Sequence, residues 1–232
     1  MSPSRALQVF HGGTFDPVHN GHVAVACAAR DACDTEVRML PAADPPHRAP
    51  PGAGAVDRAA MVALAIAGIP RLVLDLRELE REGPSWTVDT LRALRADVGP
   101  EAPIAWLVGA DSLAGLPTWK DWRALFTLAH FIVADRSGSR LDSILARELA
   151  ETLRGRWTDD ADSLRRAPSG LVLRLNQPLQ AHSATDLRRR IGAGLPWRDL
   201  VAPAVADYIV ERGLYGVDRA PAVIGSPPDA SL

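Results

Sequence analysis

The chain has 232 residues, of which 47% are hydrophobic and 23% charged, and its formal net charge is -2. This size and composition are typical of a globular protein with a sizeable core, and the near-neutral charge excludes bulk binding of nucleic acid or acidic membranes. No apolar run approaches the roughly 20 residues of a membrane-spanning helix, and the first residues do not resemble a signal peptide.

The two cysteines, Cys27 and Cys33, lie six residues apart on a predicted helix and therefore on different faces of it. This arrangement is neither a disulfide framework nor a metal-binding pair. Together with the absence of a targeting signal in the sequence, it suits a reducing compartment. We therefore expect a cytoplasmic protein.

Short apolar runs alternate along the chain with longer amphipathic segments. The runs predict strands at 7–10, 36–40, 71–76, 104–109, 130–135 and 171–175. The amphipathic segments predict helices at 20–32, 56–68, 85–97, 184–193 and 203–212. Strands separated by helix-length connections predict an α/β fold: a Rossmann-like, doubly wound, mostly parallel sheet with helices on both faces. Ligands bind such a sheet beyond the carboxyl ends of its strands.

The composition predicts one domain over residues 1–216 and a tail over 217–232. The tail is rich in Pro, Ala and Ser, so we expect it to be disordered. Segment 139–169 is charged and irregular, and we expect one helix and a solvated loop there.

The stretch "QVFHGGTFDPVHNGH" at residues 8–22 predicts a turn between a strand and a helix that binds an anion. Gly12 and Gly13 directly follow the predicted strand, where glycine allows a positive φ and the close approach of a ligand. The free amides at the start of the next helix favour anions. His19 and His22 lie on the same side of its first turn, so the pattern indicates a phosphate site in which imidazole replaces lysine.

Other interpretations of this stretch remain open. The glycines can form a simple tight turn, and the two histidines can be ordinary surface residues. Asp16, His19 and His22 could bind a metal, but no fourth ligand is evident and Asp16 is better suited to bracing the turn through its own backbone bonds. His11, at the end of the predicted strand, is either a packed residue or a ligand.

A second candidate anion site is "AHSATDLRRRI" at residues 181–191. Ser183 suits a helix N-cap, and Asp186 three residues later can complete a capping box. Thr185 and Arg188 are three residues apart, so hydroxyl and guanidinium can share one anion with the helix start. The alternative is a well-capped helix with a basic, solvated face.

The loop "LPAADPPHRAP" at residues 40–50 follows the second predicted strand and is too rich in proline for a helix. It therefore lies at the carboxyl end of the sheet and can carry His47 and Arg48 over the site. A solvated loop is the alternative, which we prefer for Arg48 alone.

Another predicted helix start, in "EREGPSWTVDTLRAL" at residues 80–94, carries Ser85, Trp86 and Thr87. These residues can bind a substrate group, although simple capping by Ser85 explains them equally well.

The stretch "LVGADSLAGLPTWKDWRAL" at residues 107–125 follows the fourth predicted strand. Asp111, just beyond the strand end, can accept hydrogen bonds from ribose hydroxyls. Trp119 can stack on a planar ring, whereas Trp122 is expected in the core.

These motifs carry a family resemblance. "GGTFDPVHNGH" resembles the (H/T)-x-G-H signature of the nucleotidyltransferase superfamily, and residues 182–188 resemble its second signature, I-S-x-T-x-x-R. With "PPHR", "PSWT", "GADS", "PTW", "HFIVADR" and "YIVERGLY", the chain resembles bacterial nicotinate-nucleotide adenylyltransferases from about residue 7 to 215. The resemblance implies transfer of the adenylyl group of ATP to nicotinate mononucleotide, which yields nicotinate adenine dinucleotide and pyrophosphate in NAD biosynthesis.

The resemblance also implies roles for individual residues. Those implied to be catalytic are His19, His22 and Arg188. Those implied to bind ATP are Gly12, Gly13, Thr14, Phe15, Gly109, Asp111, Ser183 and Thr185. Those implied to bind the nicotinate nucleotide are His47, Ser85, Trp86, Thr87, Trp119 and Arg136. The chain departs from the family at His182, where isoleucine is usual, at Asp135, where a basic residue is frequent, and at Ser137, which replaces a proline.

The implied chemistry requires no general base, because the attacking phosphate is already ionised. We expect no protein metal ligands, and Mg²⁺ bound mainly through the ATP phosphates. The expected partners are ATP and nicotinate mononucleotide, with no nucleic acid and no membrane. The alternatives are an enzyme that prefers nicotinamide mononucleotide or another phosphorylated acceptor, and a non-catalytic nucleotide sensor. The sequence does not predict the oligomeric state.

Overall fold

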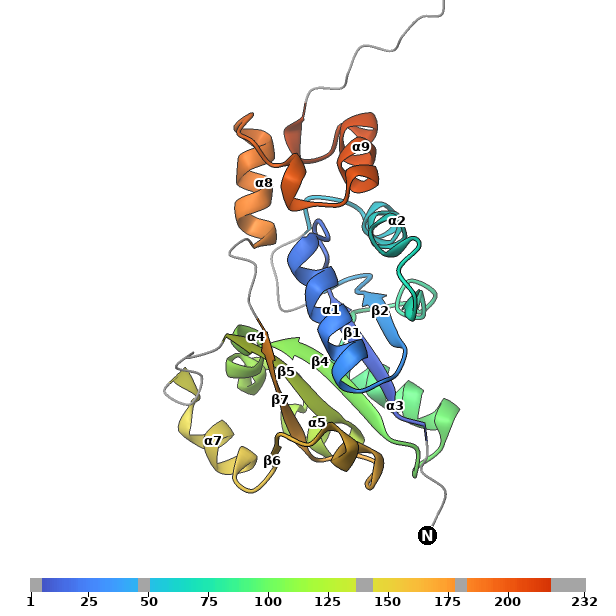
Figure 1. The fold of residues 1–232 in the computed structure, drawn as a ribbon, viewed down its shortest axis with the longest axis vertical. Helices are drawn as coiled ribbons and strands as arrows, with labels where there is room; N and C mark the ends of the chain where they lie inside the picture. The colour runs from blue at the N-terminus through green and yellow to red at the C-terminus, as the bar shows by residue number, and fades with distance from the viewer. Residues whose placement is uncertain (1–5, 46–50, 137–143, 178–182, 218–232) are drawn as a thin grey trace, which may run out of the picture.

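The computed structural model describes residues 6–45, 51–136, 144–177 and 183–217. Within these ranges the strands form one sheet in the order β3-β2-β1-β4-β5-β7-β6, and every neighbouring pair is parallel (Figure 1). The strands are β1 (Gln8–Gly13), β2 (Val37–Pro41), β3 (Leu72–Leu74), β4 (Ile104–Gly109), β5 (His130–Arg136), β6 (Trp157–Thr158) and β7 (Val172–Gln177). The predicted parallel α/β sheet is confirmed.

The α-helices cover both faces of this sheet. They are α1 (Asn20–Ala32), α2 (Ala55–Ile66), α3 (Thr87–Val98), α4 (Ala110–Ala114), α5 (Trp122–Leu128), α7 (Arg147–Leu153), α8 (Ala184–Gly192) and α9 (Pro203–Arg212). Buried side chains of α1, α2, α8 and α9 belong to one hydrophobic core, here called the α1-side core. Those of α3, α4, α5 and α7 belong to a second core, the α3-side core. The doubly wound arrangement is therefore confirmed.

The strand order reverses between β1 and β4, which lie side by side in the middle of the sheet. Their register places Gln8 opposite Ile104 and Phe10 opposite Trp106. In a doubly wound sheet this reversal opens a crevice beyond the carboxyl ends of the two central strands. The loops after β1 and β4 therefore begin where a ligand is expected.

Helices α8 and α9 lie together at one end of the molecule, beyond the starts of α1 and α2 (Figure 1). The hydroxyl of Tyr208 on α9 donates to Oδ1 of Asp57 on α2 over 2.8 Å. Leu187 and Ile191 of α8 and Val205 of α9 are buried in the α1-side core. The C-terminal part of the chain is thus packed beside the phosphate-binding turn predicted near the N-terminus.

The structure corrects the sequence-based elements at a few places. The helix predicted within 139–169 is α7, but the adjoining stretch contains a short edge strand, β6, where we expected only a solvated loop. β6 pairs in parallel with β7, and Trp157 packs against the α3-side core and lies beneath the guanidinium of Arg174, 4.8 Å from ring centre to Cζ. Residues 139–143 lie outside the described ranges.

Several other predictions also fall outside those ranges. His47, Arg48, Ser137, His182 and residues 218–232 are among them, so the division into a domain over 1–216 and a tail stays a prediction. Both cysteines are free thiols, and burial raises the pKa of Cys33 to about 11. Among the residues that the structure describes, no helix is long and apolar enough to cross a membrane.

Candidate active site

Two imidazoles cap the start of α1 reciprocally. Nδ1 of His19, the N-cap residue, accepts a hydrogen bond from the amide of Gly21 over 3.1 Å. Nδ1 of His22 accepts one from the amide of His19 over 3.2 Å. A ring nitrogen that accepts carries no proton, so the neutral tautomer of each ring places its hydrogen on Nε2. The capping box therefore converts both histidines into Nε2–H donors at a helix N-terminus.

Packing holds the two imidazoles close together. Their rings stack with centroids 3.7 Å apart and an interplanar angle of 26°. The Phe15 ring meets His22 edge-on at 5.1 Å and His11 at 5.3 Å. His19 is buried and His22 is half-buried. The prediction that His19 and His22 share one side of the first helical turn is confirmed.

The glycine pair serves a different purpose from the one we expected. Gly12 and Gly13 are the last residues of β1, and the positive φ in this turn belongs to Phe15, at 49°. A Cβ at Gly12 would lie 2.1 Å from the ring of Trp106, and one at Gly13 would lie 2.9 Å from the ring of Phe15. Both glycines thus make room for aromatic side chains of the protein itself. Neither glycine uses the positive φ that its missing side chain allows.

Asp16 is buried and connects three distant segments of the chain. Its carboxylate accepts hydrogen bonds from the amides of Gly52 and Ala53, over 2.8 and 3.1 Å, and from the hydroxyl of Tyr215 over 2.8 Å. Its backbone carbonyl accepts from Nη1 of Arg188 over 2.6 Å. The prediction that Asp16 braces the turn through its own backbone was wrong, because the fold brings other backbone amides to the carboxylate.

The second predicted anion site lies against the first. Ser183 is the N-cap of α8, and its Oγ accepts from the amide of Asp186 over 3.1 Å. Nη2 of Arg188 donates to Oγ1 of Thr185 over 3.4 Å, while Nη1 of the same guanidinium reaches the turn before α1 at Asp16. Arg188 therefore joins the starts of two helices that are far apart in the sequence.

Asp186 does not complete the expected capping box with its side chain. Its carboxylate instead pairs with Arg189 and Arg190, at 2.7 Å in each case. These two guanidiniums lower the pKa of Asp186. Two of the three consecutive arginines of α8 thus pair within their own helix, whereas Arg188 reaches the turn before α1 at Asp16.

The loops after β4 and β5 add candidate residues at the same edge of the sheet. Gly109 ends β4 and is the N-cap of α4, and Asp111 is exposed in the first turn of that helix. Arg136 is the last residue of β5. Since β1, β4 and β5 are consecutive in the sheet, these positions follow the central strands on the side where β1 leads to the histidines.

Ser85 connects the loop after β2 to the start of α3. Its hydroxyl oxygen accepts from the amides of Ala43 and Asp44, over 3.0 and 3.2 Å. Trp86, and not Ser85, is the N-cap of α3, which begins at Thr87. The alternative explanation of Ser85 as a simple helix cap is therefore wrong.

The two tryptophans predicted to contact the acceptor lie on the same side of the sheet. Trp86 and Trp119 are half-buried and pack against the α3-side core. Nζ of Lys120 lies 5.6 Å from the centre of the Trp86 ring and 2.9 Å from the carboxylate of Asp89. The segment carrying Trp119 therefore meets the start of α3. Trp122 is buried in the core, as predicted.

Sequence reasoning missed two buried charged residues next to these loops. Arg58 is 1% exposed, and its position relative to Met61, Val62 and Ala65 places it on the apolar face of α2. That misplaced charge was the signal that could have revealed it. Glu78 accepts a hydrogen bond from the Thr90 hydroxyl over 2.6 Å, and burial raises its pKa.

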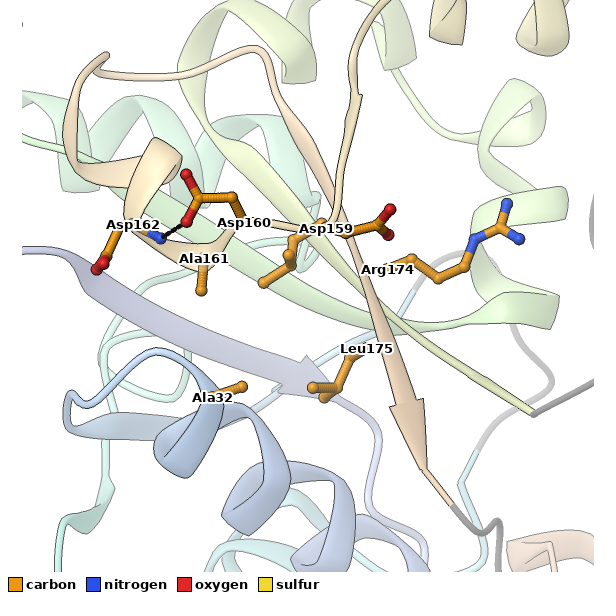
Figure 2. A pocket seen from close by; sticks show the side chains of 8 residues that line it. Ala32, Asp159, Asp160, Ala161, Asp162, Arg174 and Leu175 are labelled. Atoms are coloured by element: carbon orange, nitrogen blue, oxygen red, sulfur yellow. Dashed lines mark hydrogen bonds between the residues drawn. The ribbon is translucent and has the colours of Figure 1, made fainter.

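A separate groove of about 350 Å³ lies beside β7 (Figure 2). It is lined by Ala32, Asp159, Asp160, Ala161, Asp162, Leu173, Arg174 and Leu175. Figure 2 shows the carboxylates of Asp159 and Asp162 pointing apart. None of the predicted site residues lines this groove, so it is not the candidate active site.

Comparison with known proteins gives consistent matches over nearly the whole chain. A family model described as cytidylyltransferase-like matches residues 10–190. A protein of Stenotrophomonas maltophilia (strain K279a) named "Probable nicotinate-nucleotide adenylyltransferase" is 56% identical over 215 residues, which are 90% of this chain and 97% of that protein. A protein of the same name from Xylella fastidiosa (strain M12) is 44% identical over 216 residues, 91% of this chain and 97% of that protein.

Solved structures support the fold. Nicotinic acid mononucleotide adenylyltransferase of Plasmodium falciparum, complexed with NaAD, superposes with a TM-score of 0.68 at 15% identity, over 92% of this chain and 98% of that one. The family model and the two relatives are the stronger findings. The chain therefore belongs to the cytidylyltransferase-like family, among the bacterial nicotinate-nucleotide adenylyltransferases.

Proposed function

We propose that His19, His22 and Arg188 carry out the transfer of the adenylyl group of ATP to nicotinate mononucleotide. In this reaction a phosphate oxygen of the mononucleotide forms a bond to the α-phosphorus of ATP. The bond from that phosphorus to the oxygen shared with the β-phosphate breaks, and pyrophosphate leaves. The observation that carries the proposal is the 2.6 Å hydrogen bond from Arg188 to the Asp16 carbonyl, which joins the two anion-binding helix starts.

The reaction needs alignment and charge stabilisation more than proton transfer. The attacking phosphate is already ionised, so its repulsion by the triphosphate and the charge on departing pyrophosphate dominate the barrier. The Nε2–H groups of His19 and His22, the Arg188 guanidinium and the amides at the starts of α1 and α8 suit this task. Ser183 and Thr185 extend the same donor set.

The other proposed residues divide between the two substrates. Gly109 and Asp111 follow β4 and receive the ribose of ATP in our proposal, next to the turn that contains Thr14 and Phe15. The mononucleotide occupies the region of α3, where Thr87 receives the nicotinate carboxylate. The indole of Trp119 stacks on the pyridine ring there. Ser85, Trp86, His47 and Arg136 complete this half-site.

Nucleotidyltransferases use ATP together with a divalent cation, and we propose Mg²⁺ held mainly by the ATP phosphates and water. In the described ranges no three His, Cys, Asp or Glu side chains are grouped as a protein metal site requires. Asp16, one candidate ligand, already accepts hydrogen bonds from two amides and a hydroxyl. This carboxylate is therefore occupied, and in our proposal the cation arrives with its substrate and neutralises charge on the polyphosphate.

The proposal is tested by following pyrophosphate release from ATP and Mg²⁺ with three acceptors in turn: nicotinate mononucleotide, nicotinamide mononucleotide and phosphopantetheine. We expect the highest kcat/KM with nicotinate mononucleotide and no turnover after the cation is chelated. Preference for the amide would move the assignment to a different acceptor. Turnover with phosphopantetheine alone, or with no acceptor, would overturn it.

A further inference from the structure

We infer that Arg58 is a positioning residue for adenylyl transfer, which holds the phosphate-binding turn and the loop after β2 in one fixed relation. The inference deepens the proposed function and rests on it. Arg58 contacts no proposed substrate site directly, and it acts through the backbone of the segments that do.

The guanidinium of Arg58 donates to three carbonyl groups from three segments. Nη1 reaches the carbonyl of Thr14 over 2.6 Å, Nη2 reaches that of Ala43 over 2.9 Å, and Nε reaches that of Ala53 over 3.2 Å. Thr14 belongs to the turn before α1, Ala43 to the loop after β2, and Ala53 to the segment leading into α2. A planar guanidinium has a rigid donor geometry, so these contacts set the spacing of the segments.

The cost of burying this charge argues against a passive role. Arg58 is 1% exposed, and burial lowers the pKa of its guanidinium. Its hydrogen-bond acceptors are carbonyl groups, while the charges of Asp16 and Glu78 act on it from nearby. Burying a cation without a bonded carboxylate is expensive.

The contacts of Arg58 continue into the acceptor half of the site. Ala43, whose carbonyl binds Arg58, donates its amide to the hydroxyl of Ser85 over 3.0 Å. Ser85 directly precedes Trp86 and Thr87, the proposed nicotinate site. One short path of hydrogen bonds therefore links the turn that aligns ATP to the helix start that aligns the mononucleotide. In-line attack depends on how the phosphate of the mononucleotide is placed relative to the α-phosphate of ATP. In our proposal Arg58 fixes that placement.

The test compares Arg58→Met and Arg58→Lys with a matched control, Arg95→Met. Arg95 also binds backbone carbonyls, although it is half-buried where Arg58 is fully buried. It lies at the amino ends of the strands, against residues 99, 102, 128 and 168. We expect Arg58→Met to lower kcat by about 10- to 100-fold with KM for both substrates within a few-fold, since small misplacement has effects of that size. Arg58→Lys keeps the charge but not the planar guanidinium, so we expect its kcat to lie between those of the unaltered chain and Arg58→Met. Arg95→Met lowers Tm and leaves kcat per folded molecule unchanged.

A double-mutant cycle with His22→Asn separates positioning from general destabilisation. If Arg58 acts through the turn that leads into α1 and His22, the fold-loss of kcat in the double variant is much smaller than the product of the two single fold-losses. Multiplicative losses, or equal kcat in Arg58→Met and Arg95→Met at the same folded fraction, would overturn the inference. If Arg58→Met does not fold, Arg58→Lys carries the same cycle. Turnover of the unaltered chain with nicotinate mononucleotide is measured first, so failure of the proposed function is seen separately.

Discussion

At each end of the parallel strands, one arginine binds the backbone carbonyls of several loops, but the two loop groups differ in what they contain. We call these ends the amino edge and the carboxyl edge of the sheet. At the amino edge, Arg95 donates to carbonyls that precede β4, β5 and β7, among them Leu128 over 2.7 Å and Pro168 over 2.7 Å. At the carboxyl edge, Arg58 donates to carbonyls that follow β1 and β2. Arg95 is half-buried, whereas Arg58 is fully buried beneath the loops that follow β1 and β2.

The difference lies in what the tethered loops carry. Loops at the amino edge connect helices to strands and contain none of the proposed site residues. Those at the carboxyl edge contain the imidazole cap, Asp16 and the start of α3. In our proposal, stability alone accounts for Arg95, whereas Arg58 also aligns the two substrates. Each prediction below either removes this contrast or measures it more finely.

The largest effect is expected from Asp16→Ala at the carboxyl edge. The substitution leaves two amides and the Tyr215 hydroxyl without their shared acceptor, and it removes the carboxylate that pairs with Arg188 at 3.4 Å. We expect a loss of about 3 kcal/mol in the free energy of unfolding, as for other broken buried networks. Urea denaturation measures it. A loss no larger than that of a surface substitution would show that the carboxylate does not hold these segments together.

His22→Asn and His22→Gln divide the two functions of one imidazole. Asparagine can place an oxygen where Nδ1 accepts the His19 amide, and glutamine can place an N–H near Nε2. We expect His22→Asn to keep its stability and lose at least about 100-fold in kcat, the effect typical of a lost oxyanion donor. His22→Gln is expected to retain more activity and less stability. Near-normal turnover of His22→Asn would refute the role of Nε2–H.

The pH dependence of stability is expected to reveal His11. Burial lowers its pKa to about 4 in the folded protein, against 6.5 for the free side chain. As the pH falls, His11 is therefore protonated in the unfolded chain before it is protonated in the folded protein. The free energy of unfolding decreases as the pH falls from 6.5 towards 4. Between pH 7 and pH 5 the loss is roughly 2 kcal/mol.

His11→Phe is expected to flatten this dependence in urea denaturation at the two pH values. His130, at the amino edge, has a pKa lowered by burial as well, so some dependence remains in the variant. An unchanged slope in His11→Phe would assign the whole effect to other groups.

The smallest effect is expected at an exposed ion pair, between Arg147 and Glu151 on α7. The pair is i,i+4 spaced, and its side chains are 93% and 53% exposed. Arg147→Ala is expected to change the free energy of unfolding by less than about 0.5 kcal/mol and to leave kcat unaltered. A loss of kcat would mean that α7 contributes to the site.

Sequence reasoning succeeded where the determinants are local. Residue 20 was predicted as the start of α1, and Ser183 as an N-cap, because capping depends on residues three positions apart. The six longer strands were found from their apolar runs. β6 has only two residues and depends on a neighbour, so it had no pattern of its own.

The rest of the site was hidden because its determinants are distant in the sequence. The reason for Gly12 is the Trp106 ring on the adjacent strand. Asp16 finds its acceptor role through partners 36, 37 and 199 residues away. The motifs predicted candidate residues after the strand ends, but they did not reveal the buried Arg58, whose guanidinium binds the carbonyls of Thr14, Ala43 and Ala53.

The contact between Tyr215 and Asp16 has a consequence for biosynthesis. During translation, the tyrosine is added 199 residues after the aspartate. At roughly 5 to 20 residues per second, that delay is about 10 to 40 s. Until the tyrosine emerges, the nascent turn cannot acquire its full set of native bonds. The first-synthesised part of the proposed active site therefore completes its native contacts among the last, and a nascent chain that lacks Tyr215 lacks one of them.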